Sequence, residues 1–422
     1  MTTAKPKKER RFTPYQTLVI LLLALTQFSV VLDFMVMSPL GDMLMKQMEL
    51  TTKQFAMAVL SYAISAGISG FLTAGFADRY DRKKLLLFFY IGFIAGTFLC
   101  SIAPNYLMLV GARIVTGLFG GVIGSIAMAI VADLFPPDQR GRVVGFMQMG
   151  FGASQVLGIP ISLFIANQWG WQAPFILIVA LSVIIWATVM LKMKPVNAHL
   201  KIKSDKNPLL HLWHTLANRN YRIGFLSTAL LSLGGFLMMP WGSAFAINNL
   251  KITNQQLPIL FMVGGVSSLI IMPLMGKLSD KIDRFKLFAM ASAWMIIVVI
   301  IYTRLSDVSF AFVMVMNILM MIGIMSRMVP AMALSSMLPQ MQDRGAFMSI
   351  NSSLQQIAGG IAAGVGGMIV VQKTKTSPLE HYDTLGIVIS FILVIAVFMV
   401  YRVSQIVKRK KAAEGATAHP HH

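Results

Sequence analysis

Apolar residues run along this chain in long stretches that short polar segments separate. Twelve of these stretches are long enough to cross a lipid bilayer, because a membrane-spanning helix needs about 20 mostly apolar residues. They cover residues 15–40, 53–76, 84–103, 106–133, 142–166, 173–193, 221–248, 256–276, 286–304, 309–335, 346–371 and 384–404. The pattern predicts an all-α membrane protein with 12 transmembrane helices. An even number of spans places both termini on the same side of the membrane.

A longer polar segment separates two sets of six predicted helices. We therefore expect four parts, which are an N-terminal six-helix bundle (1–193), a linker (194–220), a C-terminal six-helix bundle (221–404) and a basic tail (405–422). Within the linker, Pro208 precedes an apolar pattern that contains Trp213. This pattern predicts a short helix lying on the membrane interface, with an ordinary loop as the alternative.

The two halves carry the same charged segment after their second predicted helix. Asp78-Arg79-Tyr80-Asp81-Arg82-Lys83-Lys84 recurs 202 residues later as Asp280-Lys281-Ile282-Asp283-Arg284-Phe285-Lys286. Arg140-Gly141 and Arg344-Gly345 repeat at nearly the same spacing, which is 204 residues. Duplicated six-helix halves are typical of transporters that bind substrate between the halves near the middle of the membrane.

These motifs resemble those of the major facilitator superfamily, and in particular its drug and sugar efflux branch of proton antiporters. That family carries Gly-x-x-x-Asp-x-x-Gly-Arg-Lys between helices two and three. Here Asp78, Arg82 and Lys83 match, whereas Ala74 and Asp81 stand where glycines are usual. The resemblance implies a fold of two six-helix bundles with a central cavity between them.

Small residues in two predicted helices extend the likeness. In the fourth helix, an arginine and spaced glycines match the family, and in the fifth a glycine series ends in Gly158-Ile159-Pro160, where the antiporter signature has Gly-Pro. Small residues let membrane helices approach closely. The positions that we assign to helix packing are Gly117, Gly120, Gly121, Gly158 and Pro160.

Two opposite charges lie at the same depth in the first half. Asp33 is seven residues from the end of the first predicted span, and Arg113 is seven residues from the start of the fourth. At 1.5 Å per residue, both lie about 10 Å below the outer surface. Buried charges in a bilayer are costly and usually paired or functional. We hypothesise that Asp33 accepts the proton and Arg113 is its charge partner; the alternatives are a purely structural pair or an Asp33 side chain that reaches outward.

The remaining charged candidates are less constrained by spacing. Arg327 lies inside the tenth predicted span. We expect it either to bind an anionic group of the substrate or to reach the inner membrane interface or a backbone carbonyl group. The resemblance implies that Asp133 pairs with Arg82 and that Asp78 faces helix eleven. Such contacts would latch the halves in an outward-open state, with ordinary solvation as the alternative. The gate candidates are Asp78, Arg82, Lys83, Asp133, Asp280 and Arg284.

Polar and flexible side chains inside the predicted spans are candidates for the substrate cavity. The chain has 32 methionines, whose flexible thioethers suit an adaptable apolar surface. The cavity candidates are Gln27, Met238, Met239, Trp241, Asn317, Arg327, Asn351 and Gln355. Proline should bend or break the helices at Pro160, Pro240 and Pro273.

Composition and charge agree with a membrane protein. Hydrophobic residues make up 56% of the 422 residues and charged residues only 12%, against roughly 25% charged in soluble domains. Of the 36 Lys and Arg residues, 28 fall on the side of the predicted spans that carries the termini and six on the other side. The positive-inside rule makes that side cytoplasmic. The net charge of +20 then reflects topology and contact with anionic lipids, not nucleic-acid binding.

Several chemistries have no residues to support them. Cys100 is the only cysteine, the chain has no phosphate-binding GxxxxGK[ST] loop, and none of its seven histidines falls in a predicted span. We therefore expect no metal, no cofactor and no enzymatic activity.

The function that this pattern favours is proton-coupled efflux of a small amphiphilic, drug-like or sugar-like compound by alternating access. A proton-coupled importer or facilitator, a lipid translocase on the same fold, and a membrane receptor that transports nothing are the alternatives. We expect a monomer in the bacterial inner membrane with both termini in the cytoplasm.

Overall fold

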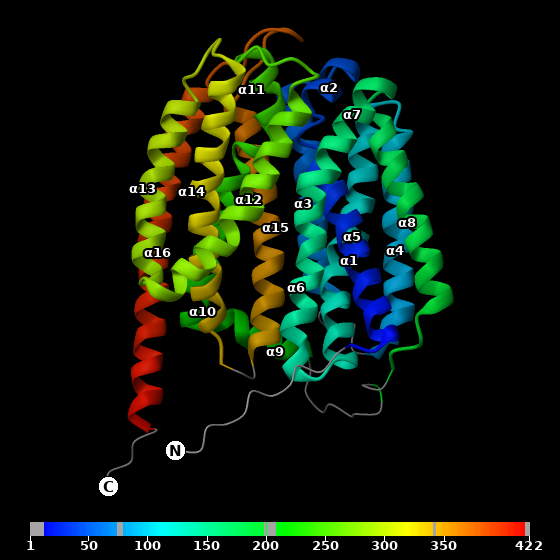
Figure 1. Ribbon diagram of the computed structural model, residues 1–422, viewed down its shortest axis with the longest axis vertical. Helices are drawn as coiled ribbons and strands as arrows, with labels where there is room; N and C mark the ends of the chain where they lie inside the picture. The colour runs from blue at the N-terminus through cyan, green and yellow to red at the C-terminus, as the bar shows by residue number, and fades with distance from the viewer. Residues whose placement is uncertain (1–11, 74–78, 198–199, 201–207, 341–342, 418–422) are drawn as a thin grey trace.

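The computed structural model describes residues 12–73, 79–197, 200, 208–340 and 343–417. Its long helices stand side by side, and the start of α1 lies at the same end of the molecule as the end of α16 (Figure 1). We call this end the terminal end and the opposite one the distal end. Apart from one isolated bridge between Val371 and Glu380, the described residues form no β-structure.

The helices fall into two groups that lie side by side in Figure 1. The first half contains α1 (Pro14–Val36), α2 (Gly41–Gln47), α3 (Thr52–Thr73), α4 (Arg82–Ser101), α5 (Tyr106–Leu134), α6 (Pro137–Ala153), the π-helical turn η2 (Ser154–Gly158), α7 (Ile159–Trp169) and α8 (Gln172–Lys192). The second half contains α9 (Pro208–Ala217), α10 (Arg219–Phe236), the 3₁₀ turn η4 (Met239–Trp241), α11 (Gly242–Asn248), α12 (Leu257–Lys281), α13 (Arg284–Tyr302), α14 (Phe310–Met337), α15 (Arg344–Ile369) and α16 (Tyr382–Thr417).

The predicted all-α membrane fold is confirmed, and the twelve predicted stretches correspond to twelve helical segments of the described residues. Eleven of these segments are long and apolar enough to span a bilayer. The twelfth is α15, which has 26 residues but carries Asn351 and Gln355 among its apolar ones. It packs along α3 and α10.

Three of the predicted spans are interrupted helices. The first ends in a turn before α2, the fifth contains the π-helical turn η2, and the seventh is broken by η4. Pro240 lies in η4, where its missing N–H ends the α-helical hydrogen bonding. Pro160 directly follows η2, whereas α12 continues through Pro273 without a break. A break is therefore present at Pro240, whereas bending at Pro160 and Pro273 stays a prediction.

The second aspartate in each copy of the repeated charged segment caps the helix that follows it. Asp81 caps α4, because its Oδ1 accepts the backbone N–H groups of Lys83 and Lys84 at 2.8 and 3.2 Å. Asp283 caps α13 in the same way, at 3.0 and 3.1 Å. An N-terminal cap stabilises a helix by about 1 kcal/mol. Lys408 Nζ, 2.9 Å from Asp283, lowers the pKa of that carboxyl group below its ordinary value.

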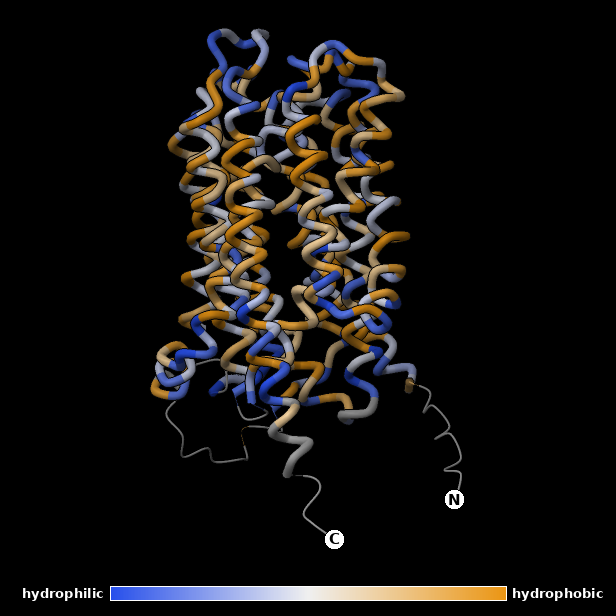
Figure 2. The backbone as a smooth tube through the Cα atoms, turned by 90° about the vertical axis from the view of Figure 1, so that its left-hand side faces the viewer, coloured by the Kyte–Doolittle hydropathy of each residue, from blue (hydrophilic) through white to orange (hydrophobic). Residues whose placement is uncertain are grey.

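The long helices of the two halves meet along two seams, one between α3 and α15 and the other between α12 and the η2–α7 region. Small residues bring the backbones together there: a Cβ added to Gly67 of α3 would lie 2.8 Å from the Ser353 carbonyl oxygen of α15. Hydrophobic residues dominate the middle of the bundle and hydrophilic ones its two ends (Figure 2). This distribution matches a bilayer around the middle of the bundle.

The linker prediction of a short helix corresponds to α9, at the terminal end in Figure 1. Trp213 on this helix is exposed, and α9 packs against α10 and α15. Its place on the membrane interface stays a prediction, as do the boundaries of the four parts.

Candidate functional site

The two intramembrane charges of the first half form an ion pair. Arg113 Nη1 on α5 donates a hydrogen bond to Asp33 Oδ2 on α1 at 2.9 Å. Thr97 Oγ1 on α4 donates to Asp33 Oδ1 at 3.1 Å. Both charged side chains are completely buried. Asp33 therefore does not reach outward, and its carboxylate has three helices around it.

Aromatic rings separate this ion pair from the second half. The guanidinium carbon of Arg113 lies 4.3 Å from the centre of the Tyr62 ring, a cation–π geometry. Tyr62 contacts Phe34 with ring centres 5.3 Å apart, and Phe34 contacts Phe236 of α10 at 5.8 Å. The pair thus lies inside the first half, two rings away from the second. The predicted pairing of the two charges is thus present, and in this conformation Tyr62 and Phe34 lie between the pair and the second half.

The chemistry of the site follows from its burial. Removing one charge from a fully buried ion pair is destabilising, because the other charge is left uncompensated. A protonated, neutral Asp33 would therefore leave the guanidinium of Arg113, on which the Tyr62 ring packs, without its counter-charge.

The gate candidates that the structure describes bind within their own halves. Arg82 Nε lies 3.3 Å from Asp133 Oδ2, and both residues belong to the first half. Lys83 Nζ donates to the Met190 carbonyl at 2.8 Å. In the second half, Arg284 Nη2 lies 3.6 Å from the exposed Asp280. Asp78 lies outside the described residues.

Arg327 on α14 is a buried cation in the second half. Its Nε donates to Ser292 Oγ at 3.0 Å, and its guanidinium carbon lies 5.3 Å from the Phe288 ring centre. Within the described part of the chain, no carboxylate lies within 4.0 Å of it, and its Nη2 is buried without a hydrogen-bond partner. Among the described residues, its guanidinium donates no hydrogen bond to a carbonyl oxygen. The site therefore holds one cation with unused hydrogen-bonding capacity.

Two stretches of the sequence, residues 23–363 and 224–420, match the Major Facilitator Superfamily. The chain belongs to this superfamily. It is 26% identical over 341 residues to YbcL of Bacillus subtilis strain 168, an uncharacterised MFS-type transporter, with 80% of this chain and 84% of that protein covered. It is 32% identical over 152 residues to multidrug resistance protein 3 of the same organism, with 36% and 30% covered.

Solved structures share the fold of this superfamily member. A bacterial homologue of the human lysosomal transporter Spinster, in an inward-facing and occupied conformation, has a TM-score of 0.75 at 16% identity and covers 94% of this chain and 98% of that one. The D-xylose–proton symporter has a TM-score of 0.71 at 17% identity, with 90% and 97% covered. The protein is thus a multi-pass membrane transporter and not an enzyme, as predicted.

The cavity candidates of this superfamily member are scattered. Trp241 is fully buried at the distal end, where its ring packs edge-on against Phe55 with centres 5.7 Å apart. It therefore lines no open surface in this conformation. Asn317 Nδ2 donates to the Leu260 carbonyl at 3.5 Å, which ties α14 to α12. Gln355 is exposed, and the partly exposed candidates are Gln27, Met238, Met239 and Asn351.

The packing glycines of α5 lie where this helix crosses α3. A Cβ added to Gly121 would lie 2.5 Å from the Ala66 carbonyl oxygen, and one added to Gly117 would collide with the Tyr62 carbonyl. At Gly120, the added atom would meet the Tyr62 hydroxyl at 3.2 Å. In η2, an added Cβ at Gly158 would lie 2.6 Å from the Leu32 side chain of α1. The close packing of α5 on α3 holds Tyr62 against Arg113.

Sequence reasoning missed the residues that join the halves. Ser268 Oγ of α12 donates to Gln155 Oε1 of η2 at 3.0 Å. A larger group of polar residues joins the halves at the distal end, between α2 and α11. The sequence did carry a signal for the group between α2 and α11. The distance along the chain between these two helices equals the spacing of the internal repeat to within a few residues.

Proposed function

We propose that the protein is a secondary active transporter that exports a small amphiphilic, drug-like or sugar-like compound in exchange for protons by alternating access. The observation that supports this most strongly is the fully buried ion pair of Asp33 and Arg113. A buried carboxylate that can take up a proton, next to a contact between the halves, supplies the coupling that an antiporter needs. A purely structural pair remains the alternative that the experiments below distinguish.

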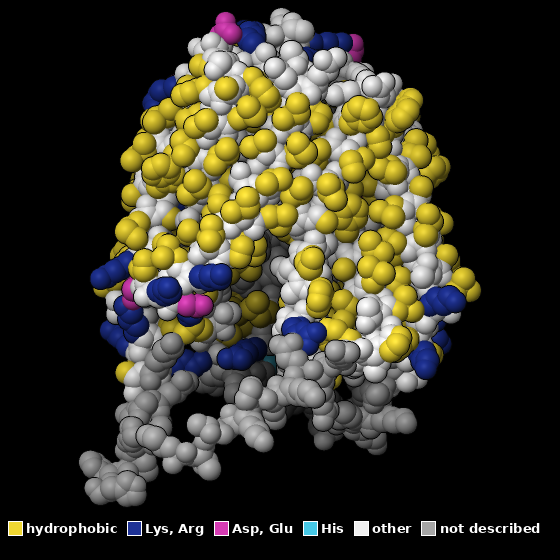
Figure 3. All heavy atoms as spheres, viewed as in Figure 1, with side chains coloured by type: hydrophobic (Ala, Val, Ile, Leu, Met, Phe, Trp, Pro, Cys, Tyr) yellow, Lys and Arg dark blue, Asp and Glu magenta, His cyan; other side chains and the backbone are white. Residues whose placement is uncertain are grey.

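The orientation follows from the basic residues. Lys and Arg side chains gather toward the terminal end of the face shown in Figure 3. The positive-inside rule favours this end as the cytoplasmic one. We therefore place both termini in the cytoplasm and the protein in the bacterial inner membrane, as a monomer. Basic residues at this end would also contact anionic lipid headgroups.

Export of a drug-like compound is supported by the name of one relative, multidrug resistance protein 3. Proton coupling with a sugar substrate has a counterpart in the D-xylose–proton symporter, which shares the fold. Import, facilitated diffusion and lipid translocation on the same fold are the alternatives. For Arg327, we propose a contact with an anionic group of the substrate, because its Nη2 has no partner among the described residues.

Transport by inside-out vesicles tests this function. With an acidic interior, vesicles that contain the protein should accumulate at least one of three probes: tetraphenylphosphonium, xylose or cholate. The imposed pH gradient should collapse faster when that probe is added. Accumulation of cholate with loss on Arg327→Leu would support the anion contact. Accumulation that needs the opposite gradient, or equilibration without any gradient, would favour the importer or the facilitator instead.

The second proposal concerns the gate. We propose that the Arg82–Asp133 pair is part of a latch that holds the halves together in the outward-open state. Arg82→Asp and Asp133→Arg should each lower the initial transport rate about tenfold or more, because each removes a hydrogen bond to a charged group. The double swap should recover most of the rate. Unchanged rates in both single variants would mean that the pair is ordinary surface solvation.

A further inference from the structure

Each half contains one short helix at the distal end, directly after a break in its first long helix. These are α2 (Gly41–Gln47) and α11 (Gly242–Asn248), which both have seven residues and both begin with glycine. Their first residues are 201 positions apart, close to the 202-residue spacing of the charged repeat. They are therefore the same element of the two halves. In the structure they pack against each other, so equivalent parts of the repeat meet between the halves.

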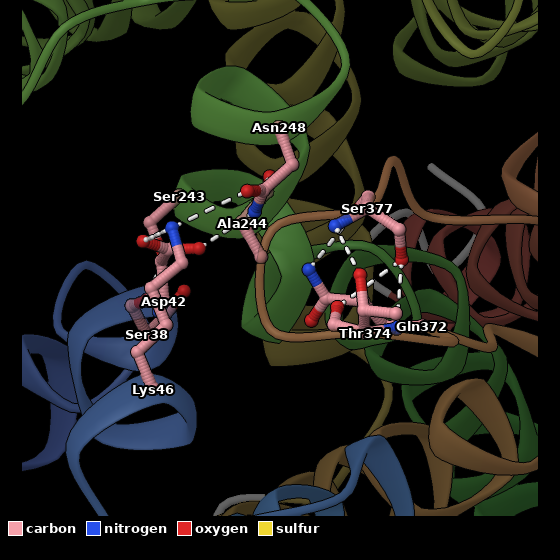
Figure 4. Close-up of polar contacts among 9 residues, drawn as sticks. All are labelled: Ser38, Asp42, Lys46, Ser243, Ala244, Asn248, Gln372, Thr374 and Ser377. Atoms are coloured by element: carbon pink, nitrogen blue, oxygen red, sulfur yellow. Dashed lines mark hydrogen bonds and ion pairs between the residues drawn. The ribbon is translucent and has the colours of Figure 1, made fainter. Parts of the chain in front are cut away.

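Polar groups connect these two helices across the contact between the halves (Figure 4). Asn248 Nδ2 donates to Asp42 Oδ1 at 2.6 Å, and Ser243 Oγ donates to the Ser38 carbonyl at 2.8 Å. The backbone N–H of Asp42 donates to Ser243 Oγ at 3.4 Å. Ser38 Oγ donates to the Met239 carbonyl. Every one of these bonds joins a residue of the first half to one of the second.

The contact is buried and contains a charge. Asp42, Ser243 and Asn248 are buried, and Lys46 Nζ lies 2.7 Å from Asp42 Oδ2 and 3.3 Å from Asn248 Oδ1. At the equivalent place in α11 the chain has Ser243, without a charge. A single buried carboxylate thus accepts hydrogen bonds from both halves. Separating the halves would remove the Asn248 donor and leave the charge with fewer partners.

At the terminal end, three ion pairs between described residues each connect residues of one half. Arg82 with Asp133, Asp280 with Arg284, and Lys408 with Asp283 are each confined to a single half. The surface between the halves is hollowed near this end (Figure 3). The conformation is therefore closed at the distal end, where hydrogen bonds join the α2 and α11 regions of the two halves.

We propose that Ser38, Asp42, Ser243 and Asn248 form a distal lock that holds this end closed and must break each time the transporter opens to the distal side. The lock consists of equivalent helices of the two halves, so a rocking motion separates them directly. The proposal rests on alternating access, but not on the identity of the substrate or on proton coupling. Its test therefore needs no substrate and no pH gradient.

The experiment measures how far apart the distal ends of the halves lie. Spin labels replace Gln168 and Arg304, which are exposed at the distal ends of the first and second halves, in a Cys100→Ser background. Double electron–electron resonance on the full chain in lipid nanodiscs then gives the populations of closed and open states. We expect Ser243→Ala and Asp42→Ala each to lower the closed-to-open ratio about tenfold or more, since each removes hydrogen bonds that involve a charged residue or a buried acceptor.

Two matched controls separate the lock from a general loss of stability. Glu380→Ala removes a 2.7 Å ion pair with Lys373 that lies inside the second half at the same end. Gly41→Ala adds a Cβ that would lie 2.9 Å from Phe55 and 3.2 Å from the Pro240 carbonyl of the other half, whereas Gly242→Ala adds one into open space. Glu380→Ala and Gly242→Ala should leave the distances unchanged, and Gly41→Ala should open the distal end.

Two results would overturn the proposal. One is a distance distribution that stays the same in Ser243→Ala, Asp42→Ala and Gly41→Ala, whether or not the melting temperature falls, because the contacts would then serve folding alone. The other is an equal shift in the control variants. Absence of proton-coupled transport in the unchanged protein would contradict the proposed function but would not contradict the proposal of a distal lock. The two failures can therefore be told apart.

Discussion

Asparagine in place of Asp33 should abolish transport driven by a pH gradient, because it removes the only proton-accepting group of the buried ion pair. The change keeps the size of the side chain and its ability to accept a hydrogen bond from Thr97. It also leaves Arg113 buried without a counter-charge, which typically costs about 3–5 kcal/mol. A loss of transport in this single variant is therefore ambiguous between lost coupling and lost stability.

The double variant Asp33→Asn with Arg113→Gln resolves this ambiguity. Neutralising both partners should restore much of the thermal stability, since no uncompensated charge is left. Coupling should stay lost, and downhill movement of the probe should become independent of pH. The measurements are melting temperature and vesicle transport with and without a pH gradient, with the exposed Asp383→Asn as the control. If the double variant recovered gradient-driven transport, the pair would be structural and the proton site would lie elsewhere.

Alanine at Gly117 should lower the melting temperature by the largest amount of any single small substitution in α5. The added methyl group would collide with the Tyr62 carbonyl and the Ser65 hydroxyl of α3, and overpacking of this kind costs about 1–3 kcal/mol. Because Tyr62 covers Arg113 at 4.3 Å, transport should fall as well.

Gly111 provides the matched control for this prediction, since it lies in the same helix and an added Cβ there would meet no atom within 4 Å. Gly111→Ala should leave the melting temperature unchanged or raise it slightly, because alanine favours a helix over glycine. Thermal unfolding of the purified protein in detergent measures both. Equal melting temperatures for the two variants would show that α3 moves aside at no cost, and that the close approach of α3 and α5 is not required.

The ion pair was predictable because, in a membrane-spanning helix, the number of residues from the end of the span gives the depth of a residue in the membrane. Asp33 and Arg113 are equally far from the ends of their predicted spans on the same side, and a straight helix has a fixed rise per residue. Their neighbours Thr97 and Tyr62 were not predictable, because spacing along one helix says nothing about which face its neighbours present. The family's loop motif likewise left Asp81 unexplained, and the structure shows it as the cap of α4.

The sequence could have predicted that the two helices of the distal lock are equivalent, but not that they touch. The repeat spacing relates Gly41 to Gly242, so the two short helices could have been recognised as equivalent. That they touch depends on how the halves are tilted, and many weak contacts along α3, α12 and α15 set that tilt together. The expected contact between Arg82 and Asp133 is present within the first half, and its part in a latch between the halves stays a prediction.

The sequence by itself determined the number of spans, the duplication and the depth of the buried charges, because a lipid environment forces each backbone segment to satisfy its own hydrogen bonds as a helix. Only the tertiary structure decided which residues cover the ion pair, where helices break, and which end of the molecule is closed. These features depend on packing between helices far apart in the chain, where side-chain shape and the tilt of whole bundles act together.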